Sequence, residues 1–175
     1  MPKQTGEVNK TQRILSVYYL LTHCQEVSMR ELANQLPGSK KTFSRDIALL
    51  KQAGVQVVYS AKRQAFVLAQ KRRNAPDFPE AKSKARYIAK IIRLLTVMDG
   101  IPEEDCDVWY MQTIPGAAKR TMQRDFAVLN SIGFSINYER EAWNMHDAGT
   151  DVPPRHYYCD RPNGAYVLTT FKMEA

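Results

Sequence analysis

The chain has 175 residues, of which 44% are hydrophobic and 25% charged, and its net charge is +7. These values are ordinary for a folded soluble protein, and no apolar run approaches the ~18 residues of a membrane span. Residues 1–10 lack the apolar stretch of a secretory signal, so we expect a cytoplasmic protein without a membrane partner. The three cysteines are far apart in the sequence, so we do not expect a disulfide framework.

The positive charge is concentrated in the first part of the chain. Residues 1–75 hold 13 Lys and Arg against 4 Asp and Glu, a balance of +9, whereas residues 76–175 hold 12 against 14, a balance of −2. A basic half beside a nearly neutral half favours a polyanionic partner for the first, nucleic acid above all. A soluble protein with a merely basic surface is the alternative.

The apolar periodicity and turn residues of the first part predict helices over 11–24, 28–36 and 39–53, then strands over 55–59 and 65–68. Ser28 and Glu31 have the spacing of a capping box at the second helix. Ser39 is a favourable N-cap for the third helix, and Gly54 is a favoured residue after its end. Cys24 falls in the apolar pattern of the first helix and is expected in the core.

The second part of the chain repeats the same order of elements. Prolines and charges over 70–84 indicate a linker between a domain over 1–69 and a domain over 85–175. The patterns after it predict helices over 82–98, 103–113 and 117–132, then strands over 134–138 and 165–168.

An internal repeat supports this division. Residues 39–59, SKKTFSRDIALLKQAGVQVVY, recur as AKRTMQRDFAVLNSIGFSINY over 118–138, with a constant offset of 79 and no gap. Such a match indicates a duplicated module of about 75 residues. Three helices and a hairpin in each copy predict a mainly α protein with small β-wings (α+β), built from two tandem winged helix-turn-helix domains.

The third helix of each copy has an amphipathic pattern. Helical spacing places Phe43, Ile47 and Leu50 on the core side. The opposite side carries Lys41, Ser44, Arg45, Ala48 and Gln52, and the second copy has Arg120, Gln123, Arg124, Ala127 and Ser131 there. Basic and amide side chains around a small residue suit a DNA major groove, although a surface helix commonly has a polar face for no such reason.

An aspartate follows the central arginine in both copies. Asp46 and Asp125 lie off the exposed side of their helices, where an acid would repel phosphate only if it pointed outward. We therefore expect both to be structural and to pair with a base on a neighbouring helix.

The run over 39–47, followed by Leu50 and Gly54, resembles the DNA-binding domain of DeoR-like regulators and of bacterial regulators that carry WYL domains. The residues over 164–168, Gly-Ala-Tyr-Val-Leu, match the usual end of that family's wing, while Ala65–Leu68 lacks the glycine. The resemblance implies that Lys41, Thr42, Ser44 and Arg45 contact bases and phosphates. The chain departs from the family in having no room for a sensor domain after the second copy and in having Ala117-Ala118 where the family prefers Ser.

These considerations give one set of expected DNA-binding residues, in the recognition helix over 39–53, the first wing and, in the second copy, the helix over 117–132. They are Ser39, Lys40, Lys41, Thr42, Ser44, Arg45, Gln52, Lys62, Arg63, Lys119, Arg120, Thr121, Gln123 and Arg124. An acidic cluster over 103–107 in the second copy would repel DNA.

The second wing carries a long insertion, over 139–163. It has three open interpretations: an aromatic partner or dimer surface that includes Trp143, Tyr157 and Tyr158, a metal site using His146, His156 and Cys159, and a plain long loop. The spacing matches no zinc pattern, so neither a metal nor another cofactor is expected. The near-neutral charge of the second domain and its aromatic insertion favour a homodimer formed through that domain.

The sequence therefore predicts a sequence-specific transcription regulator that binds double-stranded DNA in a bacterial cytoplasm, associated with the nucleoid. An enzyme is not expected, since the chain has no Gly-rich phosphate loop, nucleophile elbow or metal-ligand set. Two alternatives are a protein-interaction subunit of the chromosome-segregation type and a plasmid-type replication initiator, both of which also pair two winged helices.

Overall fold

A computed structural model of the protein describes residues 5–24, 26–69, 82–139, 156–160 and 162. Residues 5–69 are called the first half and the described residues from 82 onward the second half. The first half contains α1 (Thr5–His23), α2 (Met29–Gln35), α3 (Lys40–Gln52), β1 (Val57–Ser60) and β2 (Ala65–Leu68). The second half contains α4 (Lys82–Gly100), α5 (Cys106–Thr113), α6 (Lys119–Ser131), β3 (Ile136–Glu139) and β4 (His156–Cys159).

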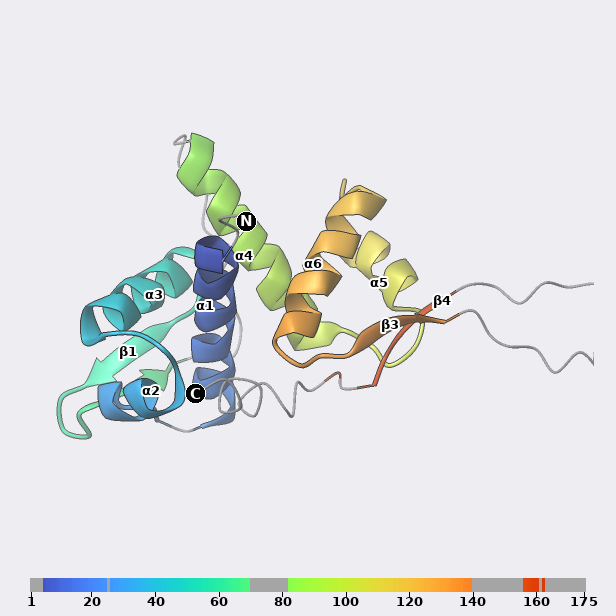
Figure 1. The fold of residues 1–175 in the computed structure, drawn as a ribbon. Helices are drawn as coiled ribbons and strands as arrows, with labels where there is room; N and C mark the ends of the chain where they lie inside the picture. Colours follow the sequence, from blue (N-terminus) through green and yellow to red (C-terminus); the bar gives the residue numbers. More distant parts are fainter. Residues whose placement is uncertain (1–4, 25, 70–81, 140–155, 161, 163–175) are drawn as a thin grey trace, which may run out of the picture.

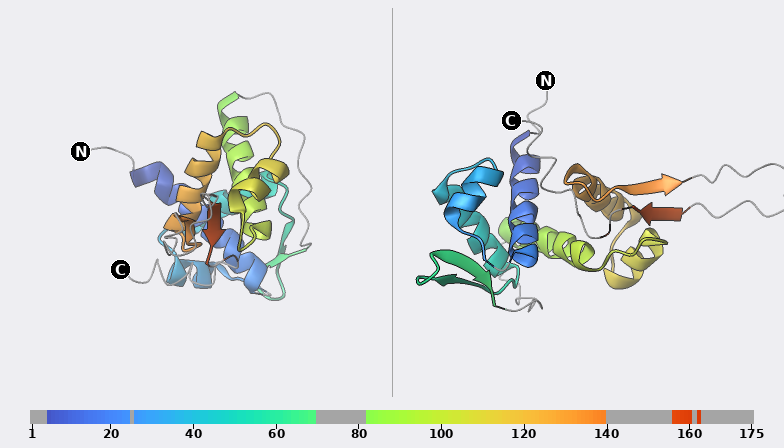
Figure 2. Two further views of the ribbon diagram at one scale, coloured as in Figure 1. Left: turned by 90° about the vertical axis from the view of Figure 1, so that its right-hand side faces the viewer. Right: turned by 90° about the horizontal axis from the view of Figure 1, so that it is seen from below.

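Each half is three helices followed by a two-stranded antiparallel hairpin (Figure 1). The expectation of a mainly helical protein with small β-elements is confirmed. In the first hairpin Val57 pairs with Leu68 and Ser60 with Ala65, and an isolated bridge between Val27 and Phe66 ties β2 to the segment before α2. The two hairpins project from opposite ends of the molecule (Figures 1 and 2).

The predicted helix boundaries are correct to within a few residues, with two informative differences. Helix α1 begins at Thr5 instead of residue 11. Helix α4 begins at Lys82, as predicted, so the last three residues of the expected linker are helical. Helix α5 begins at Cys106 instead of residue 103. The backbone of Asp105 is left-handed, with φ of 50°, and a right-handed helix cannot include such a residue.

The return strand of the second hairpin was predicted wrongly. The partner of β3 is β4, in which Cys159 pairs with Ile136, whereas the prediction had put the return strand over 165–168. The strands are therefore joined by residues 140–155, a shorter connection than the expected insertion over 139–163. The aromatic sequence His-Tyr-Tyr-Cys suits a strand, and Cys159 is buried at its end. The expected wing motif over 164–168 lies outside the described residues.

The repeat in the sequence is also a repeat in structure. Every position from Lys40 to Lys51 has the same degree of burial as the residue 79 positions later. Phe43, Ile47 and Leu50 are buried, as are their counterparts Met122, Phe126 and Leu129. Equivalent faces of α3 and α6 are consequently turned outward. Cys24, expected in the core, is exposed because α1 ends one residue before it.

The two halves pack against each other around one continuous hydrophobic core. Helix α1 contacts α4, α3 also contacts α4, and α6 contacts α1. The hydroxyls of Thr11 and Tyr87 are 3.1 Å apart, and the Tyr18 hydroxyl donates to Asp99 Oδ1 at 2.6 Å. Among the helices of the described residues, none is both long enough and apolar enough to span a membrane.

Candidate nucleic-acid interface

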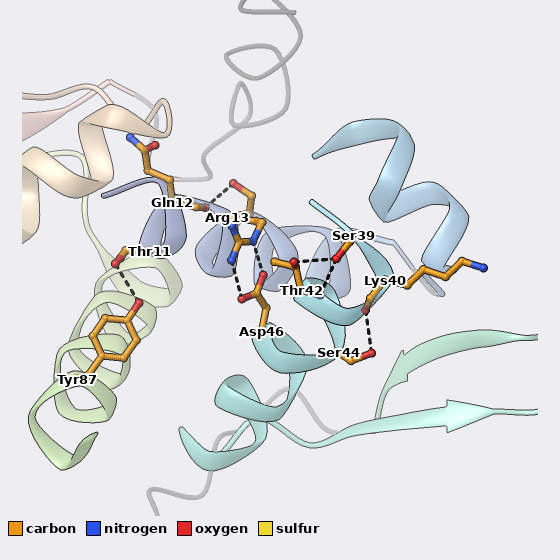
Figure 3. A network of polar contacts seen from close by, with 10 residues as sticks. Thr11, Gln12, Arg13, Ser39, Lys40, Thr42, Ser44, Asp46 and Tyr87 are labelled. Carbon is orange, nitrogen blue, oxygen red and sulfur yellow. Dashed lines mark hydrogen bonds and ion pairs between the residues drawn. The ribbon is translucent and has the colours of Figure 1, made fainter. Parts of the chain in front are cut away.

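The N-terminus of α3 is fixed by its own side chains. Ser39 has an extended backbone, and its Oγ accepts a hydrogen bond from the Thr42 amide at 3.3 Å and lies 3.0 Å from Thr42 Oγ1. The Ser44 hydroxyl donates to the carbonyl of Lys40 at 2.9 Å (Figure 3). These are the contacts of an N-cap and of a helical serine, and they set where α3 begins.

A buried ion pair fixes the inner side of α3. Arg13 on α1 donates from Nε to Asp46 Oδ2 at 2.5 Å and from Nη2 to Asp46 Oδ1 at 3.1 Å (Figure 3). Asp46 is only 1% exposed. The expectation that Asp46 is structural and pairs with a base of a neighbouring helix is confirmed. Two parallel bonds hold α3 in one rotation against α1, and that rotation determines which residues of α3 are turned outward.

The second half contains an equivalent pair with an additional donor. Arg93 on α4 donates from Nε and Nη2 to the two carboxylate oxygens of Asp125, at 3.0 and 3.4 Å, and the Tyr110 hydroxyl donates to Asp125 Oδ2 at 2.7 Å. Burial, together with the bond to Asp125, raises the pKa of Tyr110 above its ordinary value. The same expectation is thus confirmed for Asp125, and α6 is held as α3 is.

The outward side of α3 is basic and accessible. We call Lys41, Ser44, Arg45, Ala48 and Gln52 the α3 face; all five are exposed. Ser39 and Lys40 are exposed just before it, and Thr42 is half-buried. A helix with this face can approach a polyanion, with two cations and an amide available on the same side and a small residue between them.

Two further expected residues lie in the first hairpin. Lys62 and Arg63 are exposed in the turn between β1 and β2. Arg63 Nη1 lies 3.3 Å from Glu26 Oε2, with both side chains about half exposed (58% and 49%). An ion pair this exposed is weak, so a phosphate can replace Glu26 as the partner of Arg63.

The outward side of α6 has the same layout. We call Arg120, Gln123, Arg124, Ala127 and Ser131 the α6 face; the first four are exposed and Ser131 is half-buried. Of the other two residues expected here, Lys119 is exposed and Thr121 half-buried.

The second hairpin lies against α6. The Tyr157 ring lies 5.5 Å from that of Phe126 and 4.8 Å from that of Tyr138, measured between centroids, and Gln123 Nε2 donates to the Tyr157 hydroxyl at 3.4 Å. Tyr157, one of the aromatics expected on a surface for a partner, is therefore used within the half. Trp143 lies outside the described residues.

The segment before α5 presents a surface of a different kind. Glu103, Glu104 and Asp105 are exposed there, and Val108 and Met111 are exposed on α5 itself. The acidic cluster predicted from the sequence thus lies at the start of α5, on a different element from the α6 face.

The two cysteines of the second half belong to its core. Cys159 Sγ lies 3.0 Å from the Phe134 carbonyl and Cys106 Sγ 3.3 Å from that of Pro102. Burial raises the pKa of the Cys106 thiol to about 12. His146 lies outside the described residues, within which no three His, Cys, Asp or Glu side chains gather as metal ligands would.

Sequence reasoning did not identify the bases that pair with Asp46 and Asp125. Arg13 and Arg93 are 80 residues apart, one more than the offset of the repeat, so a comparison of the two copies that allows a one-residue shift could have found them. No comparable signal marked the bond of Tyr110 to Asp125. Tyr157 pairs with Tyr138 as Phe66 pairs with Tyr59 in the first hairpin, so this contact could have been found from the repeat once the strand over 156–159 was identified.

The chain was also compared with known proteins. A scan against models of protein families, a search of curated proteins and a search of solved structures each found no match.

Proposed function

We propose that the chain is a sequence-specific double-stranded DNA-binding protein, a small transcription regulator in which each half is a winged helix-turn-helix domain. The observation that carries the proposal is the α3 face. Lys41, Arg45 and Gln52 are exposed on one side of a capped helix. The other side of this helix is joined to α1 by the hydrogen bonds between Asp46 and Arg13. A preorganised helix with this chemistry fits a major groove.

The proposed mechanism divides the basic residues by role. In the groove, Arg45 near the middle of α3 would donate both guanidinium branches to a base edge, guanine being the best fit. Lys40 and Lys41 in the first turn and Lys62 and Arg63 in the hairpin would neutralise phosphates, which positions the protein without identifying a sequence. Ala48 has no side chain beyond Cβ, so it allows a close approach of the helix.

The sequence resemblance to DeoR-like and WYL-type regulators supports the same assignment. In this proposal the protein acts in a bacterial cytoplasm, at the nucleoid, and needs neither a catalytic reaction nor a cofactor. The excess of basic residues in residues 1–75 supports a nucleic-acid partner independently of the resemblance.

The proposal is tested with the full chain and a randomised pool of duplexes. Repeated selection should enrich one sequence motif, and binding should weaken steeply with salt because bound cations displace counterions from phosphates. Arg45→Ala should lower affinity for the selected duplex by about 1–3 kcal/mol while hardly changing affinity for random duplex.

Lys62→Ala is the matched control for this experiment. It removes an exposed cation of the same half and should weaken selected and random duplexes about equally. Enrichment of no motif would contradict sequence-specific binding. If a motif is enriched, an unchanged ratio of selected to random affinity in Arg45→Ala would contradict its recognition by the α3 face.

One observation favours a second candidate, a protein-interaction subunit of the chromosome-segregation type. Val108 and Met111 form an exposed apolar pair on α5, next to the acidic residues before it. Surfaces that join apolar and charged residues serve protein partners more often than DNA. If this is the main function, Val108→Glu with Met111→Glu would abolish function in cells, whereas Arg45→Ala would leave it intact.

A further inference from the structure

The packing between the halves is reciprocal. Helix α1 contacts α4, and each of these two helices also contacts the third helix of the other half: α4 contacts α3, and α1 contacts α6. If the two halves were exchanged, α1 would take the place of α4 and α3 the place of α6. The same contacts between the halves would then be found. Contacts of this kind are made by two equal subunits around a two-fold axis.

The packing of the halves leaves the outward faces of both third helices, α3 and α6, accessible to a partner. Helices α3 and α6 flank the α1–α4 pair on opposite sides (Figure 1), and neither outward face is used in the packing of the halves. The identical burial pattern from Lys40 to Lys51 and from Lys119 to Asn130 means that both faces are oriented alike within their halves. Each is held by an arginine–aspartate pair to the first helix of its own half.

The chemistry of the two faces is related but different. Lys41 and Arg45 correspond to Arg120 and Arg124, so each face presents two cations one helical turn apart. Ser44, whose hydroxyl donates to the Lys40 carbonyl, corresponds to Gln123, a longer side chain with a carbonyl acceptor and two N–H donors, one of which bonds to the Tyr157 hydroxyl. Two exposed basic faces are complementary in charge to DNA, and their difference at this position calls for two different half-sites.

We propose that one chain acts as a pseudo-dimer, in which α3 and α6 bind two half-sites of a single imperfect inverted repeat. The inference rests on the proposed function. The half-sites would be centred about one helical turn, ~10 base pairs, apart, as for two-fold related helix-turn-helix subunits. The acidic residues before α5 lower the affinity of the second half without covering the α6 face.

A pseudo-dimer differs from the homodimer that the sequence favours. That expectation relied on aromatic residues of the second wing being available to another chain, but Tyr157 packs on Phe126 and Tyr138 of its own half. The surface that a single module would use to pair is already covered, since each half covers α1 or α4 of the other.

The experiment uses the full chain and the duplex selected from a randomised pool. Native mass spectrometry should find one chain per duplex, and the selected motif should hold two related, unequal half-sites. Arg45→Ala should lose discrimination at one half-site and Arg124→Ala at the other, each with an affinity loss of about ten- to a hundredfold. Both residues are exposed, so the variants should keep the wild-type melting temperature.

Gln112→Ala, a change of an exposed α5 residue that belongs to neither face, is the control and should bind as wild type does. A single half-site with unaltered binding by Arg124→Ala would overturn the pseudo-dimer and leave the proposed function standing. Two chains on one palindrome, with both half-sites lost in Arg45→Ala, would overturn it in favour of the homodimer. If no motif is selected and neither variant changes binding, the proposed function itself fails.

Discussion

Arg13 and Asp46, 33 residues apart, are joined by two hydrogen bonds that link the first helix to the third. Because Asp46 is buried, the Arg13 guanidinium compensates a carboxylate charge that water does not reach. Arg13→Met should therefore destabilise the protein by about 3–5 kcal/mol, as expected when one partner of a buried pair is removed. Urea denaturation followed by circular dichroism measures the change.

The double variant separates the two contributions to this loss. Arg13→Met with Asp46→Leu removes the unpaired charge and should be less destabilised than Arg13→Met alone. Arg63→Ala breaks the exposed pair with Glu26 and should cost less than ~1 kcal/mol. Equal losses in Arg13→Met and Arg63→Ala would show that burial of the pair is not what matters.

The hydrogen bond from Tyr18 on α1 to Asp99 on α4 allows a test of whether the two halves unfold together. Tyr18→Phe keeps the ring and loses the bond, which should cost about 1 kcal/mol. Because the core is continuous, the cost should appear as faster amide exchange in the hairpins of both halves. Tyr59→Phe, on an exposed ring, should have no such effect. Faster exchange in the first half alone would mean that the halves unfold independently.

The N-caps of α3 and α6 allow two opposite substitutions, one that removes a side-chain cap and one that adds it. The Ser39 side chain accepts a hydrogen bond as the N-cap of α3, whereas Ala118, with the same extended backbone, has no side-chain atom that can accept one. Ser39→Ala should lower the free energy of unfolding by about 1 kcal/mol, and Ala118→Ser should raise it by a similar amount. Thermal melts measure both, and an unchanged melting temperature in Ala118→Ser would contradict the cap geometry.

Stability should fall in alkaline solution because of Cys106. Burial raises the pKa of its thiol from 9.0 to about 12. Between these values the unfolded chain releases a proton that the folded chain keeps, so the free energy of unfolding decreases as pH rises above 9. Tyr110, whose pKa is also raised, acts in the same direction. Urea midpoints measured from pH 7 to 11 should fall more steeply for wild type than for Cys106→Ala; parallel curves would exclude this contribution.

Much of the fold follows from local patterns in the sequence. The capping box of Ser28 and Glu31 forms as predicted, with both reciprocal hydrogen bonds, and Ser39 caps α3. These features are predictable because a cap involves only residues three apart. The exposure of the α3 face follows in the same way from helical spacing and the apolar residues opposite to it.

What could not be predicted depends on contacts between distant segments. The strand after β3 was predicted over 165–168 from a local pattern, but the strand that pairs with β3 is the one that buries Cys159 in the shared core. To identify Arg13 and Arg93 as the partners of the buried aspartates, one must know how the first and third helices of each half cross. The reciprocal packing of the halves has no signature in either copy alone.

That reciprocal packing also affects how such a protein can diverge. In a homodimer assembled from one gene product, every substitution occurs twice and the two recognition surfaces remain the same. Here α3 and α6 are encoded separately within one chain, so Ser44 and Gln123 can differ without disturbing the shared core that joins them. Because the copies are fused in one chain, each surface can change its DNA-sequence preference independently of the other. The buried residues of both copies must still pack in the same hydrophobic core.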